Sequence, residues 1–177
     1  MEKLDLIFKN GKIVTESGVE NCDLGISDGQ ISAIGDLSDN AEVIEDATDL
    51  LILPGGVDAH VHIDQPSGPD VEMADNFRSA TMSAAAGGNT TVLPFAMQEK
   101  GQSLRECVEN YHKKAKDNLY IDTSFHLIIS DPSPQVLGQE LPALARDGYT
   151  SFKVFMTYDD LVLNDEELLK VFEVAKK

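Results

Sequence analysis

The sequence predicts an α/β protein, the larger part of which is the N-terminal part of a (β/α)8, TIM-like barrel. From residue 51 onward, an apolar strand followed by an amphipathic helix repeats four times. The strands are almost continuously apolar, as in a parallel sheet that helices cover. Four such units match half of an eight-fold barrel. Residues 51–177 are therefore predicted to form the first four βα units of an incomplete barrel, and residues 1–50 a small β unit of their own.

The first fifty residues are predicted to form short strands joined by tight turns. Asn10-Gly11 and Asp28-Gly29 favour two-residue hairpins, because both central positions of such a turn need a positive φ. The predicted strands are Leu4–Lys9, Lys12–Thr15, Asp23–Ser27 and Gln30–Ile34. This pattern predicts a small antiparallel sheet.

The four βα units follow in order, with turn and cap residues between them. The predicted strands are 51–63, 90–95, 121–130 and 151–156. The first helix, 75–86, ends at Gly87-Gly88, and the second begins at Ser103 with Glu106 in capping-box spacing. The third, 133–146, contains Gly138 and Pro142, which weaken a helix. The fourth begins with the capping pair Asn164 and Glu167.

Half a barrel leaves two strand edges and the inner strand faces uncovered, both costly in water. We therefore expect the chain to be the front part of a longer polypeptide, or to be completed by another chain.

Composition excludes several classes of partner. The 177 residues carry 14 Lys and Arg against 31 Asp and Glu, a formal charge of -17, which repels phosphate backbones and anionic lipids. No segment approaches the ~18 apolar residues of a membrane span. Cys22 and Cys107 form no C-x-x-C motif, and the N-terminus has no secretory pattern. We expect no nucleic-acid or membrane partner and a cytoplasmic location.

The first chemical motif is a histidine pair at the end of the first strand. His60 and His62 are two residues apart, so both imidazoles lie on one strand face while Val61 faces the other way. Two such imidazoles can bind one metal ion. The alternative is that both histidines are simply hydrogen-bonded, but a loop rich in turn residues follows, where active-site ligands often lie.

The second motif is Lys153, within the apolar run SFKVFM of the fourth strand. An ammonium group cannot bind a cation, and a lysine in such a run is more often an ion-pair partner or a snorkelling side chain. Reaction with carbon dioxide would give a carbamate, whose two oxygens can bridge two metals ~3.5–4 Å apart. Combined with the histidine pair and the predicted topology, this metal-binding interpretation is favoured.

Together these segments resemble the amidohydrolase superfamily, within it the hydantoinase and dihydropyrimidinase group. The similar segments are KNGKIVT, PGGVDAHVHIDQP (residues 54–66), GGNTTV, FHLI and SFKVFMTY. The resemblance implies a small β-sandwich built from both chain ends and a (β/α)8 barrel. It also implies two divalent metals, usually zinc, bridged by carboxylated Lys153 and a hydroxide, with His60 and His62 on the more buried metal. Full-length members are usually dimers or tetramers.

The implied reaction opens the ring of a dihydropyrimidine or a 5-substituted hydantoin to an N-carbamoyl amino acid. Tyr158 matches the family tyrosine that stabilises the oxyanion, although a half-buried loop tyrosine is an equal alternative. Phe155 matches a position that lines the pocket for the substrate's side group, the alternative being a core phenylalanine. Ser67 stands where many hydantoinases carry a bulky apolar residue, so a wider pocket mouth is expected.

The other histidines and acids are expected to play other parts. His112 is assigned to the solvated surface, and His126 to packing or hydrogen bonding. Asp58 is expected to be a structural hydrogen-bonding residue, and Asp131 a loop or cap group. The family's two further histidines and its catalytic aspartate belong to later strands. We therefore expect the 177 residues alone to show little or no hydrolysis of dihydrouracil or hydantoin.

Three alternatives remain open. Allantoinases and dihydroorotases share the fold and metals, but dihydroorotases commonly place an arginine where this chain has Asp64, which would repel a substrate carboxylate. Non-catalytic relatives of dihydropyrimidinase keep the fold and oligomerise, yet they lack parts of the set that His60, His62 and Lys153 complete here. A truncated, inactive gene product is the third.

Overall fold

A computed structural model describes residues 3–176, which form two compact units that divide between Pro54 and Gly55. The division falls four residues after the predicted boundary at residue 50. The reason is that strand β5 (Leu51–Ile52) pairs in parallel with β1 (Leu4–Thr15), so its hydrogen bonds bind it to the smaller unit.

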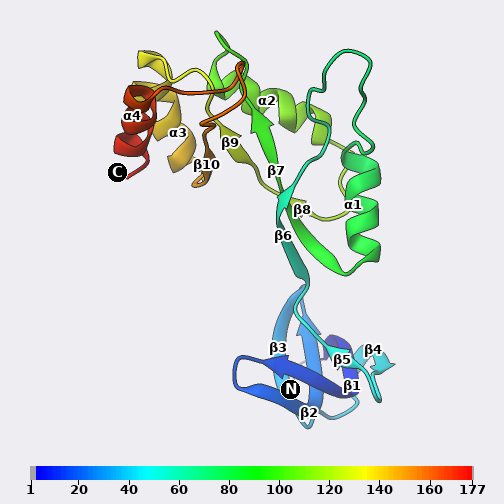
Figure 1. The fold of residues 1–177 in the computed structure, drawn as a ribbon. Coiled ribbons are helices and arrows are strands. Elements are labelled where there is room, and N and C mark those ends of the chain that lie inside the picture. The colour runs from blue at the N-terminus through cyan, green and yellow to red at the C-terminus, as the bar shows by residue number, and fades with distance from the viewer. Residues whose placement is uncertain (1–2, 177) are drawn as a thin grey trace. The chain divides into compact units, whose positions relative to one another are not determined.

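The smaller unit is a five-stranded mixed sheet in the order β3-β2-β1-β4, with β5 also beside β1 (Figure 1). Its other strands are β2 (Gly18–Ser27), β3 (Gln30–Gly35) and β4 (Ala41–Asp46). The pairs β1–β2 and β2–β3 are antiparallel, whereas β4 and β5 run parallel to β1. The expectation of a purely antiparallel sheet was wrong, because β4 was not predicted and the chain crosses over to reach β1.

The two predicted hairpin turns had different outcomes. Asp28-Gly29 joins β2 to β3 with φ values of 51° and 70°, as expected. Asn10-Gly11 is not a turn: β1 continues through it, and the register with β2 shifts between Phe8 and Gly11. Asn10 takes its positive φ of 62° at this irregularity, and its amide donates to the Asp23 carboxylate at 2.9 Å. Asn-Gly tolerates a positive φ, which would allow a turn. Here the same tolerance allows a β-bulge within β1.

The larger unit contains a parallel sheet in the order β10-β9-β7-β6, with β8 beside β7 (Figure 1). Its strands are β6 (Gly56–Val61), β7 (Asn89–Met97), β8 (Asp122–Thr123), β9 (His126–Ile128) and β10 (Phe152–Lys153). The predicted parallel pairing is confirmed, but two predicted strands are each divided in two, 51–63 and 121–130. In the first, the segment Leu53–Gly55 separates β5 from β6.

The helices begin and end close to their predicted bounds. They are α1 (Phe77–Ala86), α2 (Leu104–Ala115), the π-helical turn η1 (Val136–Glu140), α3 (Leu141–Arg146) and α4 (Asp165–Ala175). Ser103 caps α2, and Asn164 with Glu167 forms a reciprocal capping box on α4, as predicted. The predicted helix 133–146 begins as the π turn and becomes α-helical at Leu141.

Alternation along the parallel strands separates the core from the opposite sheet face. Odd-numbered residues of β9 and its flanks, Phe125, Leu127 and Ile129, pack into the core cluster with helices α1 to α4. Val61, Ala96, Phe152 and Val154 belong to or pack against the same cluster. The neighbours of these residues along the strands, including His60, Phe95, His126 and Lys153, must therefore face away from the helices.

Two further expectations concern cysteines and membranes. Cys22 and Cys107 are both free thiols. Within residues 3–176, no helix combines the length and apolar character that crossing a membrane requires.

Candidate functional site

The predicted metal-binding residues come from the two outer strands of the parallel sheet. His60 lies in β6 and His62 directly after it, whereas Lys153 ends β10 at the other edge. The intervening strands β7 and β9 bring Phe95 and His126 into direct register with each other. All five side chains therefore share the sheet face that the helices leave uncovered.

Phe95 is the centre of this cluster, and sequence reasoning did not identify it. Its ring centroid lies 4.8 Å from that of His60, 5.1 Å from that of His62 and 5.0 Å from that of His126. The Nζ atom of Lys153 lies 4.1 Å from the same centroid, within the range of a cation–π contact. One buried ring thus contacts the histidine pair and the lysine, which are about ninety positions apart in the sequence. The only sequence signal was its place in an apolar strand, TVLPFAM.

Lys153 has no carboxylate partner among the described residues 3–176, because none of the ion pairs there includes it. Its Nζ atom lies over Phe95 and, at 5.0 Å, over Phe155. Among these described residues, the ion-pair alternative for this lysine is therefore wrong.

Two side chains orient the histidine pair. The Asp58 carboxylate accepts the backbone N–H of His60 at 3.0 Å, which confirms its expected structural role. Gln65 Oε1 contacts His62 Nδ1, while Gln65 Nε2 donates to the Phe95 carbonyl at 3.3 Å. Because an amide oxygen can only accept, His62 Nδ1 carries a proton, which leaves Nε2 as the free lone pair for a ligand. Gln65 is a second residue that the sequence did not single out.

Tyr158 and Phe155 follow Lys153 on the loop after β10. The two rings lie 5.6 Å apart between centroids in an edge-to-face arrangement. Tyr158 is 69 % exposed and has a φ of 69°, so it is more exposed than the half-buried loop tyrosine considered above. A positive φ in an aromatic residue is strained, and such strain tends to occur at functional loops.

The loop between β6 and α1 holds Ser67 and Asp64. Ser67 is exposed and lines a small cavity of about 250 Å³ together with Asp64 and Gln65. Lys114 binds Asp64 twice, at its carbonyl oxygen (2.7 Å) and its carboxylate (3.1 Å). Asp64 is therefore an anchor of this loop, with a counterion of its own.

His126, His112 and Asp131 each form hydrogen bonds or contacts outside the histidine pair. His126 has both ring nitrogens hydrogen-bonded, to the Ala59 carbonyl at 2.7 Å and to Ser151 Oγ at 2.6 Å, which confirms hydrogen bonding. His112 is exposed as predicted, but its Nε2 also contacts the Tyr149 hydroxyl, and its ring packs on Phe125. The Asp131 carboxylate accepts a hydrogen bond from the Gly101 amide at 2.7 Å, which confirms its expected role as a loop residue.

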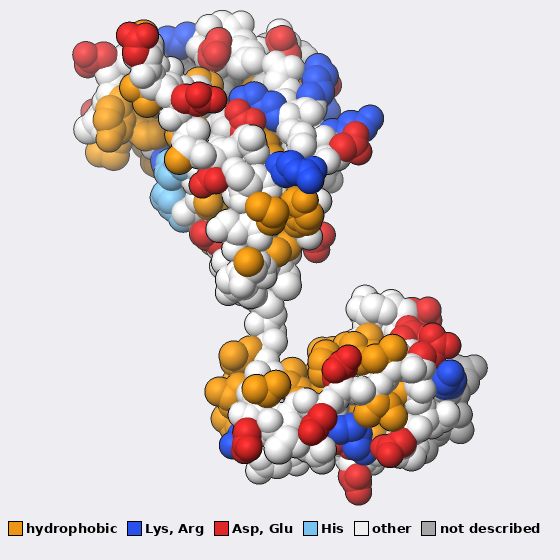
Figure 2. All heavy atoms as spheres, turned by 90° about the vertical axis from the view of Figure 1, so that its right-hand side faces the viewer, with side chains coloured by type: hydrophobic (Ala, Val, Ile, Leu, Met, Phe, Trp, Pro, Cys, Tyr) orange, Lys and Arg blue, Asp and Glu red, His pale blue; other side chains and the backbone are white. Residues whose placement is uncertain are grey.

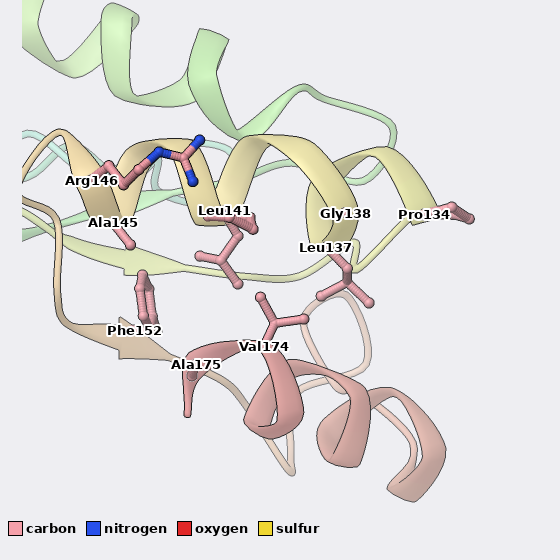
Figure 3. Close-up of a pocket in the computed structure, with 10 residues that line it drawn as sticks. Pro134, Leu137, Gly138, Leu141, Ala145, Arg146, Phe152, Val174 and Ala175 are labelled. Atoms are coloured by element: carbon pink, nitrogen blue, oxygen red, sulfur yellow. The ribbon is translucent and has the colours of Figure 1, made fainter. Parts of the chain in front are cut away.

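The described residues offer no second metal cluster, but they do contain a larger apolar cavity. Within the described part of the chain, no group of three or more His, Cys, Asp or Glu side chains could hold a metal ion, so Lys153 is needed to extend the histidine pair. A cavity of about 780 Å³ lies on the helix-covered side, between α3, α4 and β10 (Figure 3). Its lining is apolar apart from Arg146, and it contains none of the predicted site residues.

The chain is similar in sequence to hydantoinases and dihydropyrimidinases. No family model matches the chain. The D-hydantoinase of Ralstonia pickettii is 42% identical over 175 residues, covering 98% of this chain and 38% of the relative. The dihydropyrimidinase of Rattus norvegicus is 33% identical over 181 residues, covering 97% of this chain and 34% of the relative.

Solved structures agree with the sequences. A D-hydantoinase structure superposes with a TM-score of 0.92 at 41% identity, and the dihydropyrimidinase of Brevibacillus agri with 0.89 at 40%. These matches cover 98% and 99% of this chain but only 38% of each neighbour. The chain is thus homologous to the N-terminal portion of hydantoinases and dihydropyrimidinases, which confirms the group that the motifs indicated.

Proposed function

We propose that the chain supplies the N-terminal metal ligands of a cyclic amidohydrolase. The enzyme that contains this part would open dihydropyrimidines or 5-substituted hydantoins to N-carbamoyl amino acids. The observation that carries the proposal is the convergence of His60, His62 and Lys153 on the ring of Phe95. The names of the relatives, D-hydantoinase and dihydropyrimidinase, supply the substrate class.

The donor set fits divalent metal ions, with zinc the expected choice. Gln65 keeps the His62 proton on Nδ1, so that Nε2 is available as a ligand. Lys153 would join the set as a carbamate formed with carbon dioxide, since its ammonium form cannot ligate. When bound, the two metals would polarise the amide carbonyl and acidify water.

Beside these ligands, the aromatic side chains of Tyr158 and Phe155 would contact the substrate. The hydroxyl of Tyr158 would donate a hydrogen bond to the oxyanion that develops as the carbonyl is attacked. Phe155 contacts both Lys153 and Tyr158, so its ring would line the space for the substrate's side group. The small, exposed Ser67 would widen the mouth of this space.

Among related reactions, the environment of Asp64 disfavours dihydroorotate as substrate. The carboxylate already pairs with Lys114, and no arginine stands in its place. Lys114 is occupied by that pair and by the Asp64 carbonyl, so it offers little to a substrate carboxylate.

A chimera tests the proposed activity directly. Residues 1–177 would be continued by the part of the Ralstonia pickettii D-hydantoinase that lies beyond its match to this chain. Purified with Zn²⁺, the chimera should hydrolyse dihydrouracil and hydantoin, whereas residues 1–177 alone should show little or no turnover.

Matched variants identify the residues responsible. His60→Ala or Lys153→Ala in the chimera should abolish turnover, while His112→Ala, which alters a histidine on the helix-covered side of the sheet, should retain it. A folded chimera that is inactive, or one that stays active with Lys153→Ala, would contradict the proposal.

A further inference from the structure

Strand β6 is irregular at the point where it carries His60. Asp58 pairs with Val92 and Val61 pairs with Pro94, so three steps along β6 match two steps along β7. One extra residue is therefore inserted in β6, which is a bulge that includes Ala59 and His60. A bulge redirects a side chain, and its extra residue is left outside the ladder of backbone hydrogen bonds.

His126 supplies a partner for this bulge from two strands away. Its Nε2 lies 2.7 Å from the Ala59 carbonyl oxygen, although β7 separates β9 from β6 in the sheet. The imidazole crosses that distance above the Phe95 ring, 5.0 Å away between centroids. The carbonyl it binds belongs to the residue directly before His60.

The other nitrogen of the same ring is bound to the residue directly before β10. His126 Nδ1 lies 2.6 Å from Ser151 Oγ, two residues before Lys153. A carbonyl oxygen can only accept, so Nε2 carries the proton; in the neutral ring Nδ1 then accepts from the Ser151 hydroxyl. The serine thereby selects the tautomer that can hold the bulge.

We propose that His126 is a positioning residue that fixes the direction of His60. The Nε2–H bond to Ala59 holds the bulge, and the Ser151 bond keeps the proton on Nε2 and links the ring to the segment that carries Lys153. The expected effect of His126 on metal binding rests on the proposed function. Its expected effect on the conformation of β6 does not.

Nuclear magnetic resonance of the metal-free, 177-residue chain tests the geometric part. We expect the imidazole spectrum to show the Nε2–H tautomer for His126, and Ser151→Ala to raise the share of the other tautomer. His126→Phe should shift the backbone amide resonances of Ala59, His60 and Val61. His126→Gln, whose amide nitrogen can take the place of Nε2, should restore them toward their original positions.

A Zn²⁺ titration of the same variants tests the functional part. Orienting partners of metal ligands typically affect affinity by 10–100-fold, so His126→Phe should weaken Zn²⁺ binding about 10-fold and His126→Gln should recover most of it. The matched control is His112→Phe, which removes a histidine–hydroxyl contact on the other side of the sheet and should leave both readouts unchanged.

These experiments distinguish the role of His126 in positioning His60 from the proposed metal site. Unchanged β6 amide resonances in His126→Phe, or equal changes in His112→Phe, would overturn the role of His126. A wild-type chain that binds no Zn²⁺ would instead contradict the proposed metal site, and the amide shifts would then decide the role of His126 alone.

Discussion

At the scale of single residues, the buried carboxylate of Glu140 shows how a polar core group is stabilised. It accepts hydrogen bonds from Ser103 Oγ (3.0 Å), the Leu104 amide (2.7 Å) and Gln135 Nε2 (2.7 Å). Burial alone would raise the pKa of Glu140, but these bonds and one from the Arg105 amide lower the pKa below its ordinary value of 4.5. The carboxylate also sits at the N-terminus of α2, where negative charge is favourable.

Glu140→Gln is therefore expected to lower stability in a pH-dependent way. Because the folded-state pKa is depressed, the contribution of the carboxylate is present above the unfolded pKa and is lost as pH falls through the folded pKa. We expect a loss of about 1–3 kcal/mol at pH 7 that shrinks as the pH falls below about 4.5. Urea unfolding across this pH range measures it. Glu109→Gln, an exposed change within α2, is the control, and an equal loss in both variants would contradict this explanation.

At the scale of elements, Gln98 joins the ends of two parallel strands. It is fully buried just after β7, and its Oε1 accepts the amides of Ser130 and Asp131 after β9, both at 3.1 Å. Its Nε2 donates to the Gln102 carbonyl at 2.8 Å. One side chain thus satisfies several backbone groups at the strand ends from which the site is built.

Gln98→Met keeps the volume but removes these bonds. Each buried group left unsatisfied costs about 1–3 kcal/mol, so we expect a loss of at least about 2 kcal/mol in the free energy of unfolding. Gln102→Met, which removes one exposed hydrogen bond from the same loop, should cost less than about 1 kcal/mol. Chemical denaturation of both variants measures the two losses in the free energy of unfolding. Similar small losses would show that the hydrogen bonds of Gln98 do not stabilise the strand ends.

Elements with strong local signals could be predicted from the sequence, whereas those set by distant contacts could not. The caps Ser103 and Asn164 act within a few residues and were predicted correctly. The apolar runs predicted parallel strands, although two of these strands are each divided in two. The Asn10-Gly11 bulge depends on how β1 pairs with β2, and the parallel strands β4 and β5 depend on pairing with β1. No local pattern encodes these pairings. In the site, periodicity and strand-end placement indicated His60, His62 and Lys153. Phe95 and Gln65 could not be identified, because their importance arises only from what the fold places beside them.

At the scale of the whole molecule, negative charge dominates both units. Acidic side chains outnumber basic ones 31 to 14 and are spread over the surface that Figure 2 shows. Self-repulsion of like charges destabilises a compact state and is screened by salt. Raising NaCl from ~0.01 M to ~0.3 M should therefore move the urea midpoint upward, with KCl giving the same shift. A midpoint that is independent of salt, or that falls, would contradict this expectation.

In the proposed metal site, residues distant in sequence meet around Phe95, with Lys153 as the anionic ligand. The most direct test is carbon-13 NMR of the 177-residue chain supplied with ¹³C-bicarbonate and Zn²⁺. We predict a carbamate resonance that Lys153→Arg removes and that His60→Ala with His62→Ala weakens, because the metal no longer stabilises it. A spectrum without this resonance, while Zn²⁺ is bound, or one in which the resonance survives Lys153→Arg, would contradict the account.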